Sequence, residues 1–397
     1  MSADKTGGNF APLTLGILPL IDAAPLVAAL HGGFFEREGL AVRLKVEGSW
    51  ASLRDKLQVG AIQGAQLLPL MPLASSLGLD GRTTPMLSAL TLSRNGNAIT
   101  LSREVADAMA DYRRCDAGAG AREQALDAAR ALARLIAARR ADGLPPLRLA
   151  NVYPFSSHRY QLRYWLASAG LDPDRDLSLR VVPPPAMVEQ LAEGRIDGYC
   201  VGAPWNDIAA RRGIGEIVAQ GAAIWEGAQE KVFGVCRDWQ EAHREAYHAL
   251  LRALLAACRW LDEDNNHRQQ TARWLSDGGY LNVAPEDIEA SLDRQRGDII
   301  FFDGVANFPW RSQTAWYAAQ MRRWGHLAMD PDRVKAEIED TLRPDLYRRA
   351  AHSMGLDAPI ADWRCEGGHG APWHTEGAHG PLGMLPDRFL DDAIFTP

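Results

Sequence analysis

Two runs of alternating strand and helix patterns constrain this chain more than any other feature. In each run a short apolar segment is followed by an amphipathic helix pattern and then by another apolar segment, an order typical of parallel sheets covered by helices. The first run occupies residues 13–102 and the second occupies residues 147–201. Between them, residues 105–143 are rich in Ala and Arg and predict a long helix with a solvated, charged face. The sequence therefore predicts an α/β protein.

The length of 397 residues fits two lobes of ordinary domain size better than one small core. After a last strand predicted at residues 231–237, residues 240–355 have an almost entirely helical pattern. We therefore expect the helical part to wrap the first lobe. The expected division is a first lobe from residues 1–95 and 222–356, a second lobe from residues 96–221, and a Gly- and His-rich coil over residues 357–397.

Composition narrows the classes of function and the compartment. Apolar residues make up 47% of the chain and charged residues 23%, which is typical of a globular protein in water, and the net charge of −7 offers no electrostatic footprint for nucleic acid. The five cysteines are scattered without a CxxC pair, which favours a reducing compartment. The amino-terminal apolar run is interrupted by Pro19, Asp22 and Pro25, so we expect no secretory signal, no membrane insertion and a cytoplasmic location.

The segment from Ser49 to Leu73 provides the first candidate site. Ser49 can cap a helix that begins at Trp50, and the chain then returns to a small, apolar strand in which Gln66 is the polar residue near the carboxyl end. Ligands bind outside the carboxyl ends of the strands in open α/β sheets. Trp50 and Gln66 are therefore candidates to flank a binding crevice, although a packed Trp and a solvated Gln would also explain them.

Further hydrogen-bond donors recur at predicted strand ends and helix starts. Asn97 follows a turn, His158 begins a helix and Lys231 opens the last strand, while a Pro183 to Pro185 turn and a Gly202 to Trp205 loop lie at similar places. None of these candidate positions is an acid, so we expect a cleft lined by donors that suits a small anion. A turn residue, a helix cap and a solvated lysine remain the alternative explanations for the three side chains taken singly.

Catalytic and metal-binding patterns are weak. The sequence has no nucleophile elbow, P-loop, GxGxxG or HExxH motif, so we expect no enzyme. The tail carries Cys365, His369, His374 and His379 in an even, Gly-rich spacing that is unusual for structural zinc sites. We therefore predict neither a metal nor a cofactor.

Several segments resemble a known family. SWASLRD, VVPPPAMV and CVGAPW, together with LGILPLIDAAPLVAAL and EKVFGVC, are similar to the nitrate-binding and bicarbonate-binding proteins of ABC importers. The similarity covers the chain from about residue 12 to about residue 355. It implies a bilobed periplasmic-binding-protein fold of type II with the ligand held between the lobes.

The resemblance also implies which residues contact the ligand. It places nitrate contacts at Trp50, His158, Pro185, Gly202 and Lys231. Asn97 stands where nitrate binders of the family carry glutamine, and Gln66 stands where relatives often carry histidine or glutamine, as a second-tier contact. Bicarbonate relatives use an acidic residue with calcium at the position of Lys231, so the lysine favours a bare monovalent anion such as nitrate or nitrite.

The expected lack of an export signal points to the cytoplasmic nitrate-sensor branch of the family, which partners an RNA-binding antitermination regulator. The resemblance then implies a sensor that holds the regulator inactive and releases it when the anion closes the cleft, which is a shift between two populations. Two alternatives remain. One is the substrate-binding component of a nitrate ABC transporter, and the other is an enzyme like the thiamine-precursor or desulfonation-linked relatives of this fold.

Overall fold

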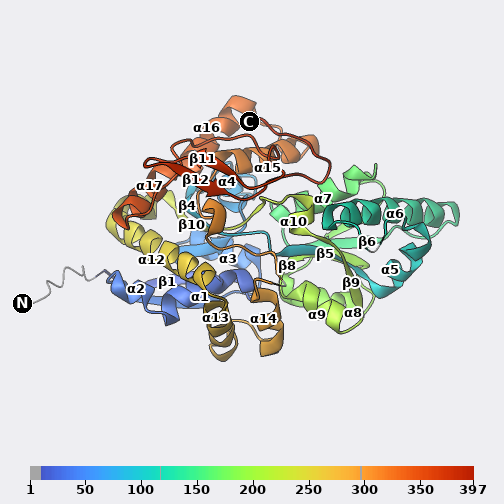
Figure 1. The fold of residues 1–397 in the computed structure, drawn as a ribbon, viewed down its shortest axis with the longest axis horizontal. Coiled ribbons are helices and arrows are strands. Elements are labelled where there is room, and N and C mark those ends of the chain that lie inside the picture. Colours follow the sequence, from blue (N-terminus) through green and yellow to red (C-terminus); the bar gives the residue numbers. More distant parts are fainter. Residues whose placement is uncertain (1–9, 117, 296) are drawn as a thin grey trace, which may run out of the picture.

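Two α/β lobes make up the computed structural model, which describes residues 10–116, 118–295 and 297–397 (Figure 1). Each lobe is built on a five-stranded sheet. The first sheet has the order β2-β1-β3-β10-β4 and consists of β1 (Leu13–Ile17), β2 (Val42–Val46), β3 (Gly64–Leu67), β4 (Met86–Arg94) and β10 (Gln229–Cys236). The second has the order β7-β6-β8-β5-β9 and consists of β5 (Asn97–Ser102), β6 (Arg148–Asn151), β7 (Ser178–Val181), β8 (Gly198–Gly202) and β9 (Gly215–Gln220).

Both sheets are mixed, so the expectation of parallel sheets is only partly correct. β1 pairs in parallel with β2 and β3, whereas β10 is antiparallel to β3 and β4. In the second sheet β6 is parallel to β7 and β8, whereas β5 is antiparallel to β8 and β9. Two neighbouring strands can pair in parallel only if a crossover connection, usually a helix, joins them. β5 and β10 instead enter their sheets directly from the other lobe.

Helices cover the faces of both sheets (Figure 1). Around the first sheet lie α1 (Ala24–His31), α2 (Phe34–Arg37), α3 (Trp50–Gln58), α4 (Met71–Ser76), α11 (Arg237–Ala242), α12 (Arg244–Glu263), α16 (Pro331–Thr341) and α17 (Pro344–Ser353). From the helical part, α12, α16 and α17 pack on β4 of the first sheet. α13 (Asn265–Asp277), α14 (Pro285–Leu292) and α15 (Arg311–Arg323) follow, and of these α14 and α15 also contact the second lobe through α9 and α7.

The second lobe contains the long helix that the Ala- and Arg-rich segment predicted. Its helices are α5 (Arg103–Met109), α6 (Ala121–Ala141), α7 (Ser157–Ser168), α8 (Met187–Ala192), α9 (Trp205–Arg211) and α10 (Gly221–Ile224). α6 is solvated on one face only, because residues such as Ala128 and Leu132 are fully buried against the lobe. Strand β9 at the edge of the sheet was not expected from the sequence.

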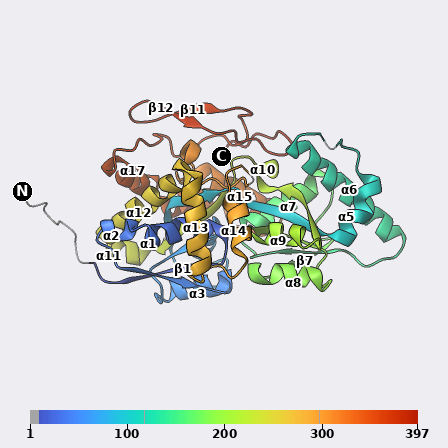
Figure 2. The same ribbon diagram turned by 60° about the horizontal axis from the view of Figure 1, so that its bottom comes forward.

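The carboxyl-terminal tail is not a coil as predicted. It forms a hairpin of β11 (Trp373–Glu376) and β12 (Pro381–Met384), seen at the top of Figure 2. Beyond the hairpin, Phe389 is fully buried with its ring centroid 5.1 Å from Trp316 of α15 and 4.8 Å from Trp225. Tyr164 of α7 donates a hydrogen bond of 2.6 Å to Asp391. These long-range contacts order a segment whose composition is typical of a coil.

The chain passes between the lobes near residues 95 and 221. Asn95 and Gly96 connect β4 to β5 with positive φ angles of 57° and 86°. Asp298 spans both crossings, because its carboxylate accepts hydrogen bonds from the Gly96 N–H at 2.9 Å and from the Ala222 N–H at 3.3 Å. The division at residues 95, 221 and 356 stays a prediction. In the part of the chain that the structure describes, no helix is long and apolar enough to span a membrane.

Candidate functional site

A cluster of polar side chains is buried where the two lobes meet. We call it the buried cluster and define it as Asp22, Gln66, Asn97, Ser157, His158, Glu230 and Lys231, each at most 1% exposed. Asp22 lies in the 3₁₀ turn after β1, Gln66 in β3, and Glu230 and Lys231 in β10, all in the first lobe. Asn97 of β5 and the pair Ser157 and His158 at the start of α7 come from the second lobe.

The carboxylate of Glu230 lies at the centre of this cluster. Its Oε1 is 2.6 Å from Lys231 Nζ and 2.7 Å from His158 Nε2. Its Oε2 accepts hydrogen bonds from Asn97 Nδ2 at 2.7 Å and from Ser157 Oγ at 3.0 Å. Each carboxylate oxygen therefore meets two donors. Because His158, Asn97 and Ser157 belong to the second lobe, one first-lobe side chain bridges the two lobes.

Lys231 is held between two carboxylates. Its Nζ lies 2.7 Å from Asp22 Oδ2 as well as against Glu230. Asp22 Oδ1 accepts a hydrogen bond from the Gln66 amide, and Gln66 Oε1 accepts one of 2.9 Å from the Leu18 N–H. The ring of Trp50 lies on another side, with its centroid 5.7 Å from Lys231 Nζ. Lys231 is therefore fixed by two anions and an aromatic face.

Burial and charge act against each other in this cluster. Burial raises the pKa of Asp22 and outweighs the opposing effect of Lys231. For Glu230, burial alone would raise the pKa, but His158 and Lys231 together lower it below its ordinary value. Burial would lower the pKa of Lys231, but Asp22 and Glu230 raise it. Lys231 and Glu230 are therefore both charged at neutral pH, as buried charges must be paired to persist.

A local irregularity brings Glu230 and Lys231 to the same side. Neighbours in a regular strand point to opposite faces. Here the pairing of β10 with β4 shifts between Gln229 and Lys231, so Glu230 has no partner residue in that ladder. Such β-bulges redirect side chains, often beside functional sites. In the second lobe, Ser156 caps α7 by accepting from the Arg159 N–H at 3.0 Å, which places Ser157 and His158 in the first turn.

The structure brings most of the predicted site residues together. Gln66, Asn97, His158 and Lys231 are members of the buried cluster, and Trp50 lies beside it. Gly202 ends β8 opposite Asn97. A Cβ atom at Gly202 would lie 3.2 Å from Asp22 Oδ2 and 3.7 Å from Lys231 Nζ, so this backbone also lines the cluster.

Pro185 lies elsewhere. It is exposed and borders a groove of about 620 Å³ that is lined by both lobes, including Pro19 of the first and Trp205 of the second. The structure therefore does not place Pro185 among the buried donors.

The expectation of a site without acids is wrong. Asp22 and Glu230 were missed as site residues, and so was Ser157. Asp22 carried a signal, since it is the one charged residue in the apolar segment LGILPLIDAAPLVAAL. Glu230 precedes Lys231 directly, but strand alternation would place it on the opposite face, and the bulge that reverses this is not evident from the residues.

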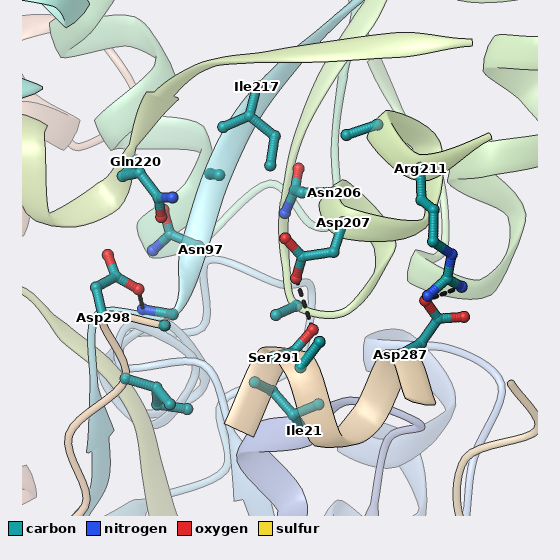
Figure 3. A pocket seen from close by; sticks show the side chains of 17 residues that line it. Ile21, Asn97, Asn206, Asp207, Arg211, Ile217, Gln220, Asp287, Ser291 and Asp298 are labelled. Atoms are coloured by element: carbon teal, nitrogen blue, oxygen red, sulfur yellow. Dashed lines mark hydrogen bonds and ion pairs between the residues drawn. The ribbon is translucent and has the colours of Figure 1, made fainter. Parts of the chain in front are cut away.

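A cavity of about 290 Å³ adjoins the cluster through Asn97 (Figure 3). Figure 3 shows Asp287 and Ser291 of α14 facing Asp207 and Arg211 of α9 across it. Ser291 Oγ donates a 2.6 Å hydrogen bond to Asp207, and Arg211 pairs with Asp287. These two contacts join the lobes and close one side of the cavity.

Asp298 lies at the edge of the same cavity, below Asn97 and Gln220 in Figure 3. Burial raises its pKa to about 6, although the Ala222 and Gly96 N–H groups favour the carboxylate. Within residues 10–116, 118–295 and 297–397, no three His, Cys, Asp or Glu side chains gather as ligands for a metal ion. His369 of the tail instead stacks on Trp373 with the ring centroids 3.7 Å apart.

Comparison with known proteins places this geometry in a family. Residues 7–276 match the NMT1-like family. The chain is 37% identical over 370 residues to the nitrate import ATP-binding protein NrtC of Synechocystis, a match that covers 89% of this chain and 52% of that protein. The chain thus spans about half the length of the first curated relatives that it matches.

Other relatives match over most of their length. The nitrate/nitrite binding protein NrtA of Synechococcus elongatus is 32% identical over 388 residues, covering 90% of this chain and 83% of that protein. The crystal structure of the periplasmic nitrate-binding protein NrtA from Synechocystis superposes with a TM-score of 0.81 and 27% identity, covering 97% of this chain and 95% of that one. This agreement confirms the bilobed periplasmic-binding-protein fold expected from the sequence. The chain therefore belongs to the NMT1-like family, as a relative of the nitrate/nitrite-binding protein NrtA.

Proposed function

We propose that the chain binds nitrate or nitrite in the buried cluster and is not an enzyme. The observation that carries this proposal is the set of four donors around Glu230, two for each oxygen of a planar carboxylate. The O–N–O edge of nitrate or nitrite has the same planar, two-oxygen form. Tetrahedral sulfate lacks that planar shape and would need a second positive charge. The names of the NrtA relatives, which are nitrate- and nitrite-binding proteins, support the same ligand class.

Within this proposal each side chain has a role. Lys231 supplies the positive charge, while Asn97, Ser157 and His158 donate to the oxygens of the anion. Among the described residues, Trp50 Nε1 and both ring nitrogens of His158 are buried without a hydrogen bond, although His158 Nε2 lies 2.7 Å from Glu230 Oε1 as an ion-pair contact. Buried donors without partners are rare and call for an explanation, and an anion beside Trp50 would supply one acceptor.

We further propose that the protein acts as a sensor of the anion. In this role the protein holds an RNA-binding antitermination regulator of nitrate assimilation genes inactive, in the cytoplasm, and releases it when the anion draws the lobes together. The support is the sequence resemblance described above and a net charge of −7 that suits a basic partner. A substrate-binding component of a nitrate ABC importer is the second candidate, favoured by the import protein NrtC among the relatives.

Calorimetric titration with nitrate, nitrite, bicarbonate plus calcium, and sulfate tests the ligand class. We expect binding of nitrate or nitrite at micromolar concentration, and tighter binding of sulfate than of either would refute the proposal. Fractionation of the source cells then separates the two roles. Recovery of the protein in the periplasm or the membrane would exclude the sensor, whereas nitrate-dependent release of a co-purified regulator would establish it.

A further inference from the structure

We propose that the Glu230 carboxylate is an internal ligand of the anion site, and that a dissolved anion binds by taking its place. Glu230 then sets the affinity and the selectivity of the site. This inference rests on the proposed function, because it assigns to Glu230 the position that nitrate or nitrite would occupy. It goes beyond that function by making binding an exchange between two anions.

The first argument is the occupancy of the donors. Lys231, His158, Asn97 and Ser157 all lie within 3.0 Å of Glu230 oxygens. These are the side chains that a planar anion would need. A second anion beside the ionised carboxylate would find its donors engaged and would be repelled by a like charge in a buried place. The cluster can therefore hold one of the two anions in this position.

The second argument is that Lys231 does not require Glu230 for neutralisation. Asp22 Oδ2 already lies 2.7 Å from the Lys231 ammonium, and both groups are buried. Glu230 adds a second carboxylate to a site with one lysine. A side chain whose only task was to neutralise Lys231 would have no need to reach the second-lobe donors Asn97 and Ser157, yet Glu230 bonds both.

The third argument is freedom to move. Glu230 is the residue skipped in the ladder between β10 and β4, so its backbone is less constrained than that of a regular strand residue. The cavity shown in Figure 3 begins at Asn97, one of the side chains that hold Glu230. Glu230 does not line this cavity itself, so a displaced side chain would reach it past Asn97.

Removal of the carboxylate is the test. Glu230→Ala and Glu230→Gln are titrated with nitrate and with formate, a free carboxylate, beside the wild type. We expect both variants to bind nitrate about tenfold tighter than the wild type, because the competing anion is gone. Formate should bind Glu230→Ala and raise its melting temperature, but should not bind the wild type. Glu216→Gln removes an acid from an exposed pair with Arg103 and should leave nitrate binding unchanged.

The outcomes separate this inference from the proposed function. Nitrate binding to the wild type with equal or weaker binding to both variants would overturn the inference and leave the function standing. If formate binds Glu230→Ala and nitrate binds no form of the protein, Glu230 is an internal ligand as inferred, and the proposed nitrate-binding function is refuted. Glu230→Ala could stay unfolded in both formate and nitrate. Glu230→Gln, which keeps the side-chain volume, then decides the question, and the inference fails if this variant binds nitrate no tighter than the wild type.

Discussion

Replacing Lys231 by methionine is the perturbation whose cost the structure defines best. The lysine side chain is fully buried, with its ammonium 2.7 Å from Asp22 and 2.6 Å from Glu230. Lys231→Met keeps an unbranched side chain one atom shorter and leaves two carboxylates in the interior without their shared cation. Loss of one partner of a buried ion pair costs about 3 to 5 kcal/mol. We expect a loss of this size in the free energy of unfolding at pH 8, measured by urea denaturation.

The pH dependence identifies the cause of that loss. Burial already raises the pKa of Asp22 while the lysine is present, and without the lysine the pKa values of Asp22 and Glu230 both rise. The carboxylates are then neutral in the folded variant at low pH, so the penalty shrinks as pH falls and grows as pH rises. The double variant Lys231→Met with Asp22→Asn should recover part of the stability at pH 8. A loss below about 1 kcal/mol at pH 8, or one equal at pH 5 and pH 8, would refute the reasoning.

Three further results are expected. Asp298 has a folded pKa of about 6 against an ordinary 3.8, so its protonated form stabilises the fold below pH 3.8 and that stability is lost as pH rises through 6. Relative to Asp298→Asn, the wild type should therefore lose about 2.4 kcal/mol between pH 4 and pH 8 in urea unfolding, and a constant difference would contradict this assignment. Gly202→Ala places a methyl group 3.2 Å from Asp22 Oδ2 and should weaken nitrate binding by about 1 kcal/mol or more in calorimetry, whereas unchanged affinity would place the ligand elsewhere. Phe389→Ala removes a fully buried ring from the tail and should cost about 3 to 5 kcal/mol of unfolding free energy, while a surface-like loss would show that the tail is not packed in solution.

Local signals allowed much of the first lobe to be predicted. Ser49 caps α3 by accepting a hydrogen bond from the Ser52 N–H, and α1 ends before Gly32 as expected. Gln66 lies in β3 and is buried, which follows from a small, apolar strand around it. The two helix ends depend on contacts between residues close in sequence, whereas the burial of Gln66 was indicated only by the apolar character of its strand.

The rest depends on contacts between distant segments. β10 is antiparallel to its neighbours because the chain enters it on its way back from the second lobe. Glu230 turns inward because of a bulge against β4, about 140 residues earlier in the chain. The acids of the site were missed for this reason, since neither Asp22 nor Glu230 stands in a motif of its own. The tail is similar, because Phe389 packs on Trp316 and Trp225, distant partners that composition does not reveal.

The tail also changes how the two lobes can turn. The backbone crosses between them near residues 95 and 221, and these crossings alone would form an ordinary two-stranded hinge. The tail adds a further connection, because it leaves the hairpin β11–β12 and ends against α6 and α7, where Arg122 pairs with Asp392. A rotation that separates the lobes must either move the end of the tail together with the second lobe or break its contacts there. We therefore expect that a protein bound to the hairpin changes the hinge angle, and with it the anion affinity, from a distance. This allosteric effect should disappear when the chain is cut after Leu385, so that the anion affinity no longer depends on the partner.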